Sequence, residues 1–281
     1  MKRHPFGANG PPVPVVGFGT WMLEKTERSR AVAVVHAALD EGLLHIDTAE
    51  LYGSGKVEDI LGEALAGRRD EAFLVSKVMP ENASREDTLR ACERSLRRLR
   101  TDRLDCYLLH WESSHPITET VAAFEELRAA GKILRWGVSN FDEARVEETV
   151  RAAGPGRVAC NQVFYHLGER TIEHAVIPTC ERHGIAVVGY SPFSHGGIPG
   201  PETPSGRVLA GIAAGFGATP RQVALAFLVR RPSLFAIPMT SRVDHVHENS
   251  LAGGLALGEE DLRRIEQAFP LAPRRGGVAT V

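Results

Sequence analysis

The stretch LHIDTAELYG, residues 44–53, places a carboxylate and a phenol directly after a short apolar run. Its first five residues have the length and apolar content of a β-strand. Asp47 stands near the end of that run, and Tyr52 follows five residues later. A second run, Phe73–Val78, carries Lys77 near its end. If the two runs are neighbouring parallel strands, these three side chains meet over one end of a sheet.

The rest of the chain repeats this arrangement, with short apolar runs alternating with amphipathic ones. Several apolar runs are continuous, as expected of strands covered on both faces. We predict eight strands, at Val15–Thr20, Leu44–Thr48, Phe73–Val78, Leu104–His110, Leu134–Ser139, Val158–Phe164, Ala186–Tyr190 and Leu234–Pro238. We predict eight helices, at Glu27–Glu41, Lys56–Ala66, Arg85–Arg100, Ile117–Ala130, Glu143–Ala153, Glu173–His183, Pro220–Arg230 and Arg242–Ala252. Eight such units in alternation predict the α/β class and a (β/α)8 TIM barrel.

Two further elements are predicted outside these units. Pro5–Val13 is expected to form an N-terminal β-hairpin around Asn9-Gly10, and Glu259–Ala268 an extra C-terminal helix. A chain of 281 residues has the length of two domains or of one barrel, and we find no linker. We therefore expect residues 1–281 to form a single barrel domain. The Gly- and Pro-rich stretch Ser194–Gly206 is either a mobile surface loop or a lid.

Composition argues against several classes of function. A net charge of −2 gives no electrostatic reason to expect nucleic acid or an anionic membrane as a partner. The four cysteines are scattered without a CxxC motif, which favours buried reduced thiols over a metal or redox site. The N-terminus lacks the apolar region of a signal peptide, and no apolar run is long enough to cross a membrane. We expect a cytoplasmic protein without a metal site.

Hydrogen-bonding side chains recur at the ends of the predicted strands. In a (β/α)8 barrel these ends and the loops after them build the active site. Read in chain order, the positions are Thr20-Trp21, Asp47, Lys77, His110, Ser139-Asn140, Gln162, Tyr190-Ser191 and Thr240-Ser241. Any one of them is weak evidence because loops are polar, but their recurrence at the same end of each unit indicates a site.

The group around Tyr52 has the elements of an acid catalyst. A tyrosine has a pKa near ~10, which is high for proton transfer at neutral pH. A nearby ammonium group on Lys77 would lower that pKa, and Asp47 would keep the ammonium charged and oriented. His110, at the end of another strand and followed by Trp111, could donate a hydrogen bond to a substrate oxygen. The alternative is that Asp47 and Lys77 form an ion pair that only joins two strands.

A nucleotide site is predicted at the eighth strand–helix unit. Gly17-Phe18-Gly19 lacks the third glycine of a Rossmann fingerprint. However, Ser241 is predicted as the N-cap of the helix at 242–252, with Asp244 three residues on, and a helix N-terminus is a ready phosphate site. Arg242 adds a guanidinium suited to phosphate. The alternative, equally compatible with the sequence, is that Arg242 is only a solvent-exposed residue in the first turn of the helix. Tyr190 could stack on a flat ring.

The sequence resembles the aldo-keto reductase family nearly from end to end. Besides HIDTAELYG, the motifs that carry the resemblance are GFGTW (Gly17–Trp21), LVSKV with Lys77, LLHW with His110, GVSNF (Gly137–Phe141), NQVFYH (Asn161–His166), GYSPF (Gly189–Phe193), IPMTSR (Ile237–Arg242) and HVHEN (His245–Asn249). It is most similar to the compact bacterial members that reduce small aldehydes and dicarbonyls such as methylglyoxal.

The resemblance implies a catalytic tetrad and an NADPH site. The tetrad would be Asp47, Tyr52, Lys77 and His110, with Tyr52 protonating the oxygen of a carbonyl that receives a hydride. The carboxamide of NADPH would be held by Ser139, Asn140 and Gln162, its nicotinamide would stack on Tyr190, and Ser191, Pro192 and Phe193 would follow the pyrophosphate. The cofactor set further includes Thr20, Trp21, Asp47, Thr240, Ser241, Arg242, His245 and Asn249. Trp21, Tyr52, His110 and Trp111 would bind the substrate.

This sequence departs from the family pattern at two points. Met239 replaces the family's strand-8 lysine near the 2′-phosphate, and His245 replaces an arginine. We favour NADP(H), with Arg242 as a substitute, and keep NAD(H) as an alternative. The loop after His110 and the tail after Phe269 are short, which predicts an open, permissive pocket. A monomer is the default expectation.

The same barrel and residues are compatible with two other functions. In a Schiff-base lyase Lys77 would be the nucleophile, which requires a neutral amine that Asp47 would disfavour. In a non-catalytic subunit the barrel would only sense a nucleotide and act through a partner, against which the intact tetrad argues.

Overall fold

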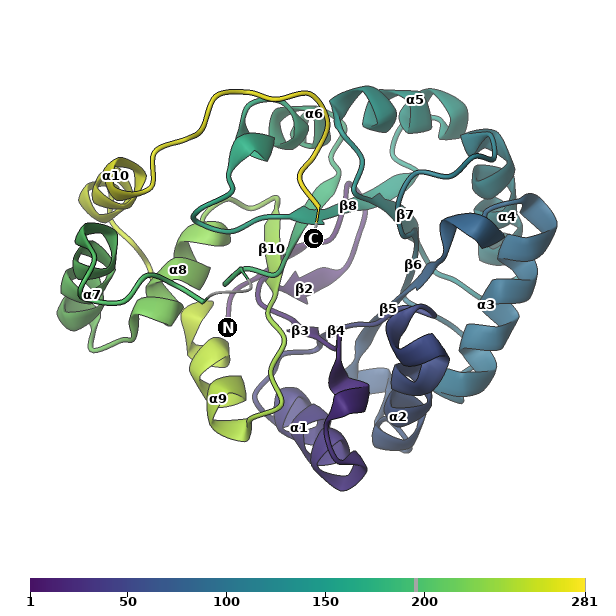
Figure 1. The fold of residues 1–281 in the computed structure, drawn as a ribbon. Coiled ribbons are helices and arrows are strands. Elements are labelled where there is room, and N and C mark those ends of the chain that lie inside the picture. Colours follow the sequence, from purple (N-terminus) through teal and green to yellow (C-terminus); the bar gives the residue numbers. More distant parts are fainter. Residues whose placement is uncertain (195–196, 281) are drawn as a thin grey trace.

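Figure 1 shows the chain as a ring of helices around a central sheet. The computed structural model describes residues 1–194 and 197–280. Eight parallel strands form this sheet, in the order β10-β9-β8-β7-β6-β5-β4-β3. They are β3 (Phe18–Gly19), β4 (His45–Asp47), β5 (Phe73–Val78), β6 (Cys106–Leu109), β7 (Trp136–Ser139), β8 (Val158–Phe164), β9 (Ala186–Tyr190) and β10 (Leu234–Ile237).

The sheet closes into a barrel between its first and last strands. Val16 pairs with Ala236, and Gly19 pairs with Met239, both in the parallel sense. The Gly17 amide donates to the Ala236 carbonyl over 2.8 Å. The predicted (β/α)8 fold is therefore confirmed, with eight strands in the predicted order and most of them slightly shorter than predicted.

Helices follow the strands and cover the outside of the barrel. They are α1 (Arg28–Asp40), α2 (Lys56–Ala64), α3 (Arg85–Leu99), α4 (Ile117–Ala129), α5 (Glu143–Ala153), α6 (Val176–Arg182), α7 (Pro204–Phe216), α8 (Pro220–Leu228), α9 (Val243–Ala252) and α10 (Glu259–Ala268). Every residue of β4, β5, β6 and β7 is buried, because one face of these strands lies inside the barrel and the other beneath the helices. This burial explains why their sequences are nearly continuous apolar runs.

The predicted N-terminal hairpin is present and closes one end of the barrel. Its antiparallel strands are β1 (Arg3–Pro5) and β2 (Pro12–Pro14). Phe6, in the turn between them, is 1% exposed, and its ring centroid lies 4.8 Å from that of Phe73 and 5.2 Å from that of Phe235. Burial of one such aromatic side chain contributes roughly 1.5–3 kcal/mol. The opposite end of the barrel, where the strands end, stays available for a site.

The sequence analysis missed helix α7 and misplaced the start of α6. Of the stretch Ser194–Gly206, residues 195–196 lie outside the described residues, and Pro204–Gly206 already belong to α7, which was not predicted at all. Thr203 caps this helix by accepting a hydrogen bond from the Gly206 amide, and Pro204 occupies its first position. Helix α6 begins at Val176 rather than Glu173, since a 3-10 turn at Thr171–Glu173 precedes it. The extra helix α10 has the predicted bounds.

The described residues contain neither a membrane-spanning helix nor a cluster of metal-binding side chains. Among residues 1–194 and 197–280, no helix is both long and apolar enough to span a membrane. In the same residues, no group of His, Cys, Asp or Glu side chains is arranged to hold a metal ion. All four cysteines are buried and free.

Candidate active site

A cavity of about 660 Å³ opens at the end of the barrel where the strands terminate. Most of the residues predicted from the strand ends line it. These are Thr20, Trp21, Asp47, Tyr52, His110, Trp111, Ser139, Asn140, Gln162, Tyr190 and Ser191. The strand-end pattern thus identified one contiguous site, as expected of this fold.

Lys77 lies at the centre of the polar contacts beneath this cavity. Its Nζ lies 2.6 Å from Asp47 Oδ1, 2.9 Å from the Thr48 carbonyl oxygen and 3.2 Å from the Tyr52 hydroxyl. The side chain is fully buried, and that of Asp47 is 2% exposed. An ammonium group has three hydrogens, and each has one acceptor here. Lys77 therefore joins Asp47 and Tyr52, as the sequence predicted.

The local backbone explains how these groups meet. Strands β4 and β5 are parallel, and Asp47 is in register with Val75, so Lys77 lies two residues farther along the next strand. Tyr52 begins the 3-10 turn Tyr52–Gly55, in which Gly53 adopts a left-handed φ of +56°. This φ suits glycine, and it returns the chain toward α2 directly after the tyrosine.

The electrostatics of the group differ from the prediction at Tyr52. Burial lowers the pKa of Lys77, but Asp47 and Tyr52 raise it by more, and the amine stays protonated. Burial raises the pKa of the Asp47 carboxyl, and Lys77 and Gln162 oppose that shift. Burial also raises the pKa of Tyr52 by more than Lys77 lowers it, so the prediction of a net decrease is wrong. The phenol therefore holds its proton at neutral pH.

His110 lies beside Tyr52 at the base of the cavity. Its ring centroid is 5.8 Å from that of Tyr52, and the side chain is 8% exposed. Burial, together with the charge of Lys77, lowers the pKa of His110 well below its ordinary value. Nδ1 has no hydrogen-bond partner among the described residues. The imidazole is thus neutral at pH 7, with one N–H to donate.

A chain of amide groups holds the other side of the site. Gln162 Nε2 donates to Asp47 Oδ2 over 2.7 Å, and Asn140 Nδ2 donates to the His110 carbonyl over 3.0 Å. The Tyr190 hydroxyl donates to Asn140 Oδ1 over 2.9 Å. Thr20 Oγ1 donates to the backbone carbonyl of Asp47. These bonds fix the positions of side chains that come from five different strand ends.

Residues 15–269 match the model of the aldo/keto reductase family. The chain belongs to this family. It is 42% identical over 264 residues to methylglyoxal reductase YeaE of Escherichia coli, covering 93% of each protein. It is 32% identical over 258 residues to a glyoxal reductase of Bacillus subtilis, covering 92% of this chain and 90% of that protein.

Solved structures show the same fold. An aldo-keto reductase from Klebsiella pneumoniae, crystallised with NADPH, superposes with a TM-score of 0.93 at 38% identity, and the match covers 100% of both chains. A second Klebsiella structure, with NADP and acetate, gives a TM-score of 0.92 at 38% identity over 100% of both chains. The resemblance inferred from the sequence motifs is confirmed.

The remaining predicted cofactor residues of this aldo-keto reductase do not line the cavity in the described part of the chain. Pro192 and Phe193 are buried, and the Arg221 guanidinium lies 3.7 Å from the centroid of the Phe193 ring. Of the others, Thr240, Ser241 and Arg242 precede α9, whereas His245 and Asn249 lie within it.

The start of α9 also differs from the prediction. Its N-cap is Arg242, with no side-chain cap, so the prediction that Ser241 caps the helix is wrong. The helix starts one residue later than expected, because the Arg242 amide donates a hydrogen bond to Thr240 Oγ1 in a turn before the helix. The Arg242 guanidinium pairs with Asp244 at the surface. Asn249 is buried, and neither of its amide atoms has a partner within the described residues.

Several cavity residues escaped the sequence analysis. Arg145 and Asp142 line the cavity, as does the C-terminal tail through Gly277, Val278 and Thr280. Met239, expected near the 2′-phosphate from its place in the family pattern, lines it as well. Although the tail is short, it forms part of the cavity wall. Asp142 follows a predicted strand end, and the same pattern could have found it. No sequence signal connects the tail to the barrel mouth, because its approach depends on tertiary contacts alone. The other missed residues are Gly19, Leu51, Glu112 and Ile237.

Proposed function

We propose that this aldo-keto reductase uses NADPH to reduce aldehydes and ketones to alcohols, with Tyr52 as the general acid. The observation that carries the proposal is the arrangement of Tyr52, Lys77 and His110 at one cavity. Tyr52 and His110 line it, and Lys77 contacts the Tyr52 hydroxyl from beneath. General acid catalysis typically contributes ~10²–10⁴ in rate.

The residues of the site fit a nicotinamide coenzyme, which would supply a hydride to the carbonyl carbon when bound. Two structural relatives were crystallised with NADPH or NADP. The buried amide of Asn249 lacks partners, and an amide that both donates and accepts suits the edge of an adenine base. Ser139, Asn140 and Gln162 would hold the carboxamide, and Tyr190 would stack on the nicotinamide. Ser191, Pro192 and Phe193 would follow the pyrophosphate. The residues Thr20, Trp21, Asp47, Thr240, Ser241, Arg242 and His245 complete the proposed set.

The protonation states support Tyr52 as a proton donor in the reductive direction. Its raised pKa keeps the phenol protonated until charge develops on the substrate oxygen. The oxygen then takes the proton from Tyr52, and the ammonium of Lys77, 3.2 Å away, stabilises the resulting phenolate. Asp47 keeps Lys77 charged throughout.

His110 would orient the carbonyl rather than transfer a proton. A neutral imidazole can donate one hydrogen bond to the carbonyl oxygen, and the lowered pKa of His110 keeps it neutral. Hydrogen-bond donors already aimed at the position where negative charge develops are effective in a buried site. Trp21 and Trp111, which line the same cavity, would contact the rest of the substrate.

We propose small carbonyl compounds as substrates, including dicarbonyls such as methylglyoxal. The methylglyoxal reductase from Escherichia coli, 42% identical to this chain, supports this substrate class. We further propose that the enzyme acts as a cytoplasmic monomer, which gel filtration would test for the oligomeric state.

The two alternative functions have less support. A lyase nucleophile must be neutral, whereas the pKa of Lys77 is raised and its amine contacts Asp47. Trapping of a substrate adduct on Lys77 with borohydride would revive that function. A nucleotide-sensing subunit would bind NADPH but would not oxidise it with any small carbonyl.

The experiment that tests the proposal follows coenzyme absorbance in the presence of methylglyoxal, nitrobenzaldehydes and simple keto esters, each with NADPH and with NADH. We expect NADPH oxidation with at least the activated aldehydes. Tight binding of NADPH, measured by fluorescence, without oxidation by any of these carbonyls would contradict the proposal.

A further inference from the structure

The C-terminal tail, residues 270–280, crosses from α10 to the mouth of the barrel (Figure 1, yellow). Gly277, Val278 and Thr280 reach the cavity and form part of its wall. Gly277 has a φ of +72°, in the left-handed region that favours glycine, and this turn directs the last residues toward the cavity.

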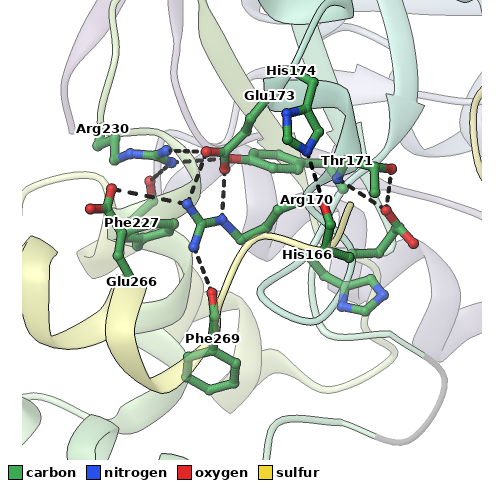
Figure 2. A network of polar contacts seen from close by, with 12 residues as sticks. His166, Arg170, Thr171, Glu173, His174, Phe227, Arg230, Glu266 and Phe269 are labelled. Atoms are coloured by element: carbon green, nitrogen blue, oxygen red, sulfur yellow. Dashed lines mark hydrogen bonds and ion pairs between the residues drawn. The ribbon is translucent and has the colours of Figure 1, made fainter. Parts of the chain in front are cut away.

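The tail begins at a buried network of charges. Arg170, 5% exposed, donates to the Phe269 carbonyl over 2.8 Å and pairs with Glu173. Arg230 pairs with the same carboxylate over 3.1 Å. Figure 2 shows both guanidinium groups converging on Glu173, with the Phe227 ring close by. Burial raises the pKa of Glu173, but its partners lower it by more, to about 2, so the carboxylate is charged. This network fixes the point where α10 ends and the tail starts.

Three further contacts hold the tail, at Ala272, Arg274 and Arg275. His174 Nε2 donates to the Ala272 carbonyl over 2.8 Å. The Arg274 guanidinium lies 2.5 Å from a carboxylate oxygen of Glu143, and that of Arg275 lies 3.3 Å from Glu169. Glu143 begins α5, whereas Glu169 and His174 belong to the segment between β8 and α6. The tail is thus attached to two separate parts of the barrel rim just before it enters the cavity.

None of the described residues beyond Arg275 is fully buried. Gly276, Gly277 and Thr280 are exposed, and Val278 is partly buried against the hydrophobic core. Both arginine side chains are more than 60% exposed, whereas Glu169 is 12% exposed and held on the rim. The two ion pairs therefore add to the apolar contact of Val278 in holding residues 277–280 against the cavity.

We propose that Arg274 and Arg275 are positioning residues that determine substrate size. Their ion pairs with Glu143 and Glu169 hold residues 277–280 as a wall of the cavity. The wall contacts small carbonyl compounds and excludes larger ones. This proposal rests on the proposed reductase function.

The first test compares specificity between a small and a large substrate. In Arg274→Ala/Arg275→Ala, the ratio of kcat/KM for methylglyoxal to that for a nitrobenzaldehyde should fall about fivefold, the factor that two exposed ion pairs can supply. The change should appear in KM, with kcat nearly constant, because neither arginine touches the reacting atoms. Arg274→Lys/Arg275→Lys should keep the wild-type ratio, and Glu143→Gln should show part of the loss.

Arg263→Ala is the matched control. Arg263 is as exposed as the two tail arginines and forms an ion pair with Glu260 within α10. Exposed ion pairs weaken with salt. The specificity ratio should therefore fall with added sodium chloride in the wild type and in Arg263→Ala, but not in the double alanine variant.

The second test measures the tail directly, without substrate. Backbone 15N order parameters of residues 276–280, measured by NMR relaxation, should be lower in the double alanine variant than in the wild type and the control. Unchanged order parameters would overturn the ion-pair anchor, and lower order parameters with an unchanged specificity ratio would overturn the role in substrate size. If the wild type reduces no carbonyl, the proposed function fails, whereas the NMR measurement still decides whether these arginines hold the tail.

Discussion

The amine of Lys77 lies 3.2 Å from the hydroxyl of Tyr52, although 25 residues separate them in the chain. The same amine lies 2.6 Å from Asp47 Oδ1 and 4.9 Å from the centroid of the Tyr52 ring. Burial alone would make ionisation of the phenol costly. With a fixed ammonium beside it, the phenolate left after proton transfer gains a counter-charge that water could not supply inside the barrel.

The first prediction concerns the proton donor. Tyr52→Phe removes only the hydroxyl and leaves the ring that packs near His110. We expect turnover of an activated aldehyde to fall at least ~100-fold, since general acid catalysis is lost. The NADPH dissociation constant, measured by fluorescence titration, should change little. Turnover close to that of the wild type would show that another group donates the proton.

The second prediction concerns the buried ion pair. Lys77→Met should lower the free energy of unfolding by about 3–5 kcal/mol, because Asp47 is left buried without its cation. Lys77→Met/Asp47→Asn removes both charges and should recover at least about 1 kcal/mol of that loss. Urea denaturation of the two variants measures the difference. If the double variant is less stable than the single one, the isolated carboxylate is not the source of the loss.

The sequence was sufficient for features that depend on local pattern. Strand β5 could be predicted to the residue, and Asp47, Lys77 and His110 could be placed at one end of the barrel because parallel strands end on the same side. Features set by tertiary contacts could not be predicted. Helix α7 begins with Thr203-Pro204, a good start signal that the Gly- and Pro-rich residues before it obscured. The net pKa shift of Tyr52 depends on how deeply the phenol is buried, which the order of residues does not reveal.

The third prediction concerns the choice of coenzyme. Arg242 is held by Asp244 at the start of α9, and its fork geometry suits a phosphate. Arg242→Ala should weaken NADPH binding about tenfold or more and leave NADH binding nearly unchanged, because a charge-assisted contact is lost only with NADPH. Asp244→Asn should strengthen NADPH binding up to about fivefold by releasing the guanidinium. Fluorescence titrations with both coenzymes measure these constants.

Equal effects on NADPH and NADH would place Arg242 away from the 2′-phosphate. Arg242→Lys is the matched control, since it keeps the charge but not the planar fork. It should retain only part of the NADPH preference if the guanidinium binds phosphate through two hydrogen bonds.

The fourth prediction concerns acid stability and His45, which lies two residues before Asp47 in β4. The side chain is fully buried, its ring packs edge-on against Phe6 and Phe73, and neither ring nitrogen has a partner in the described residues. Burial, helped by the charge of Lys77, lowers its pKa from 6.5 to about 3. Between these values the unfolded chain binds a proton here and the folded chain does not. The stability of the fold therefore decreases as the pH falls below 6.5.

His45→Leu should remove this part of the pH dependence. One pKa unit corresponds to about 1.4 kcal/mol, so His45 should account for roughly 2 kcal/mol of the stability lost between pH 7 and pH 5. The leucine variant should be at least as stable as the wild type at pH 7, because it removes a buried polar group that lacks hydrogen bonds. Urea denaturation at both pH values tests the idea. A variant that loses as much stability as the wild type would show that other groups, such as His110, dominate the acid sensitivity.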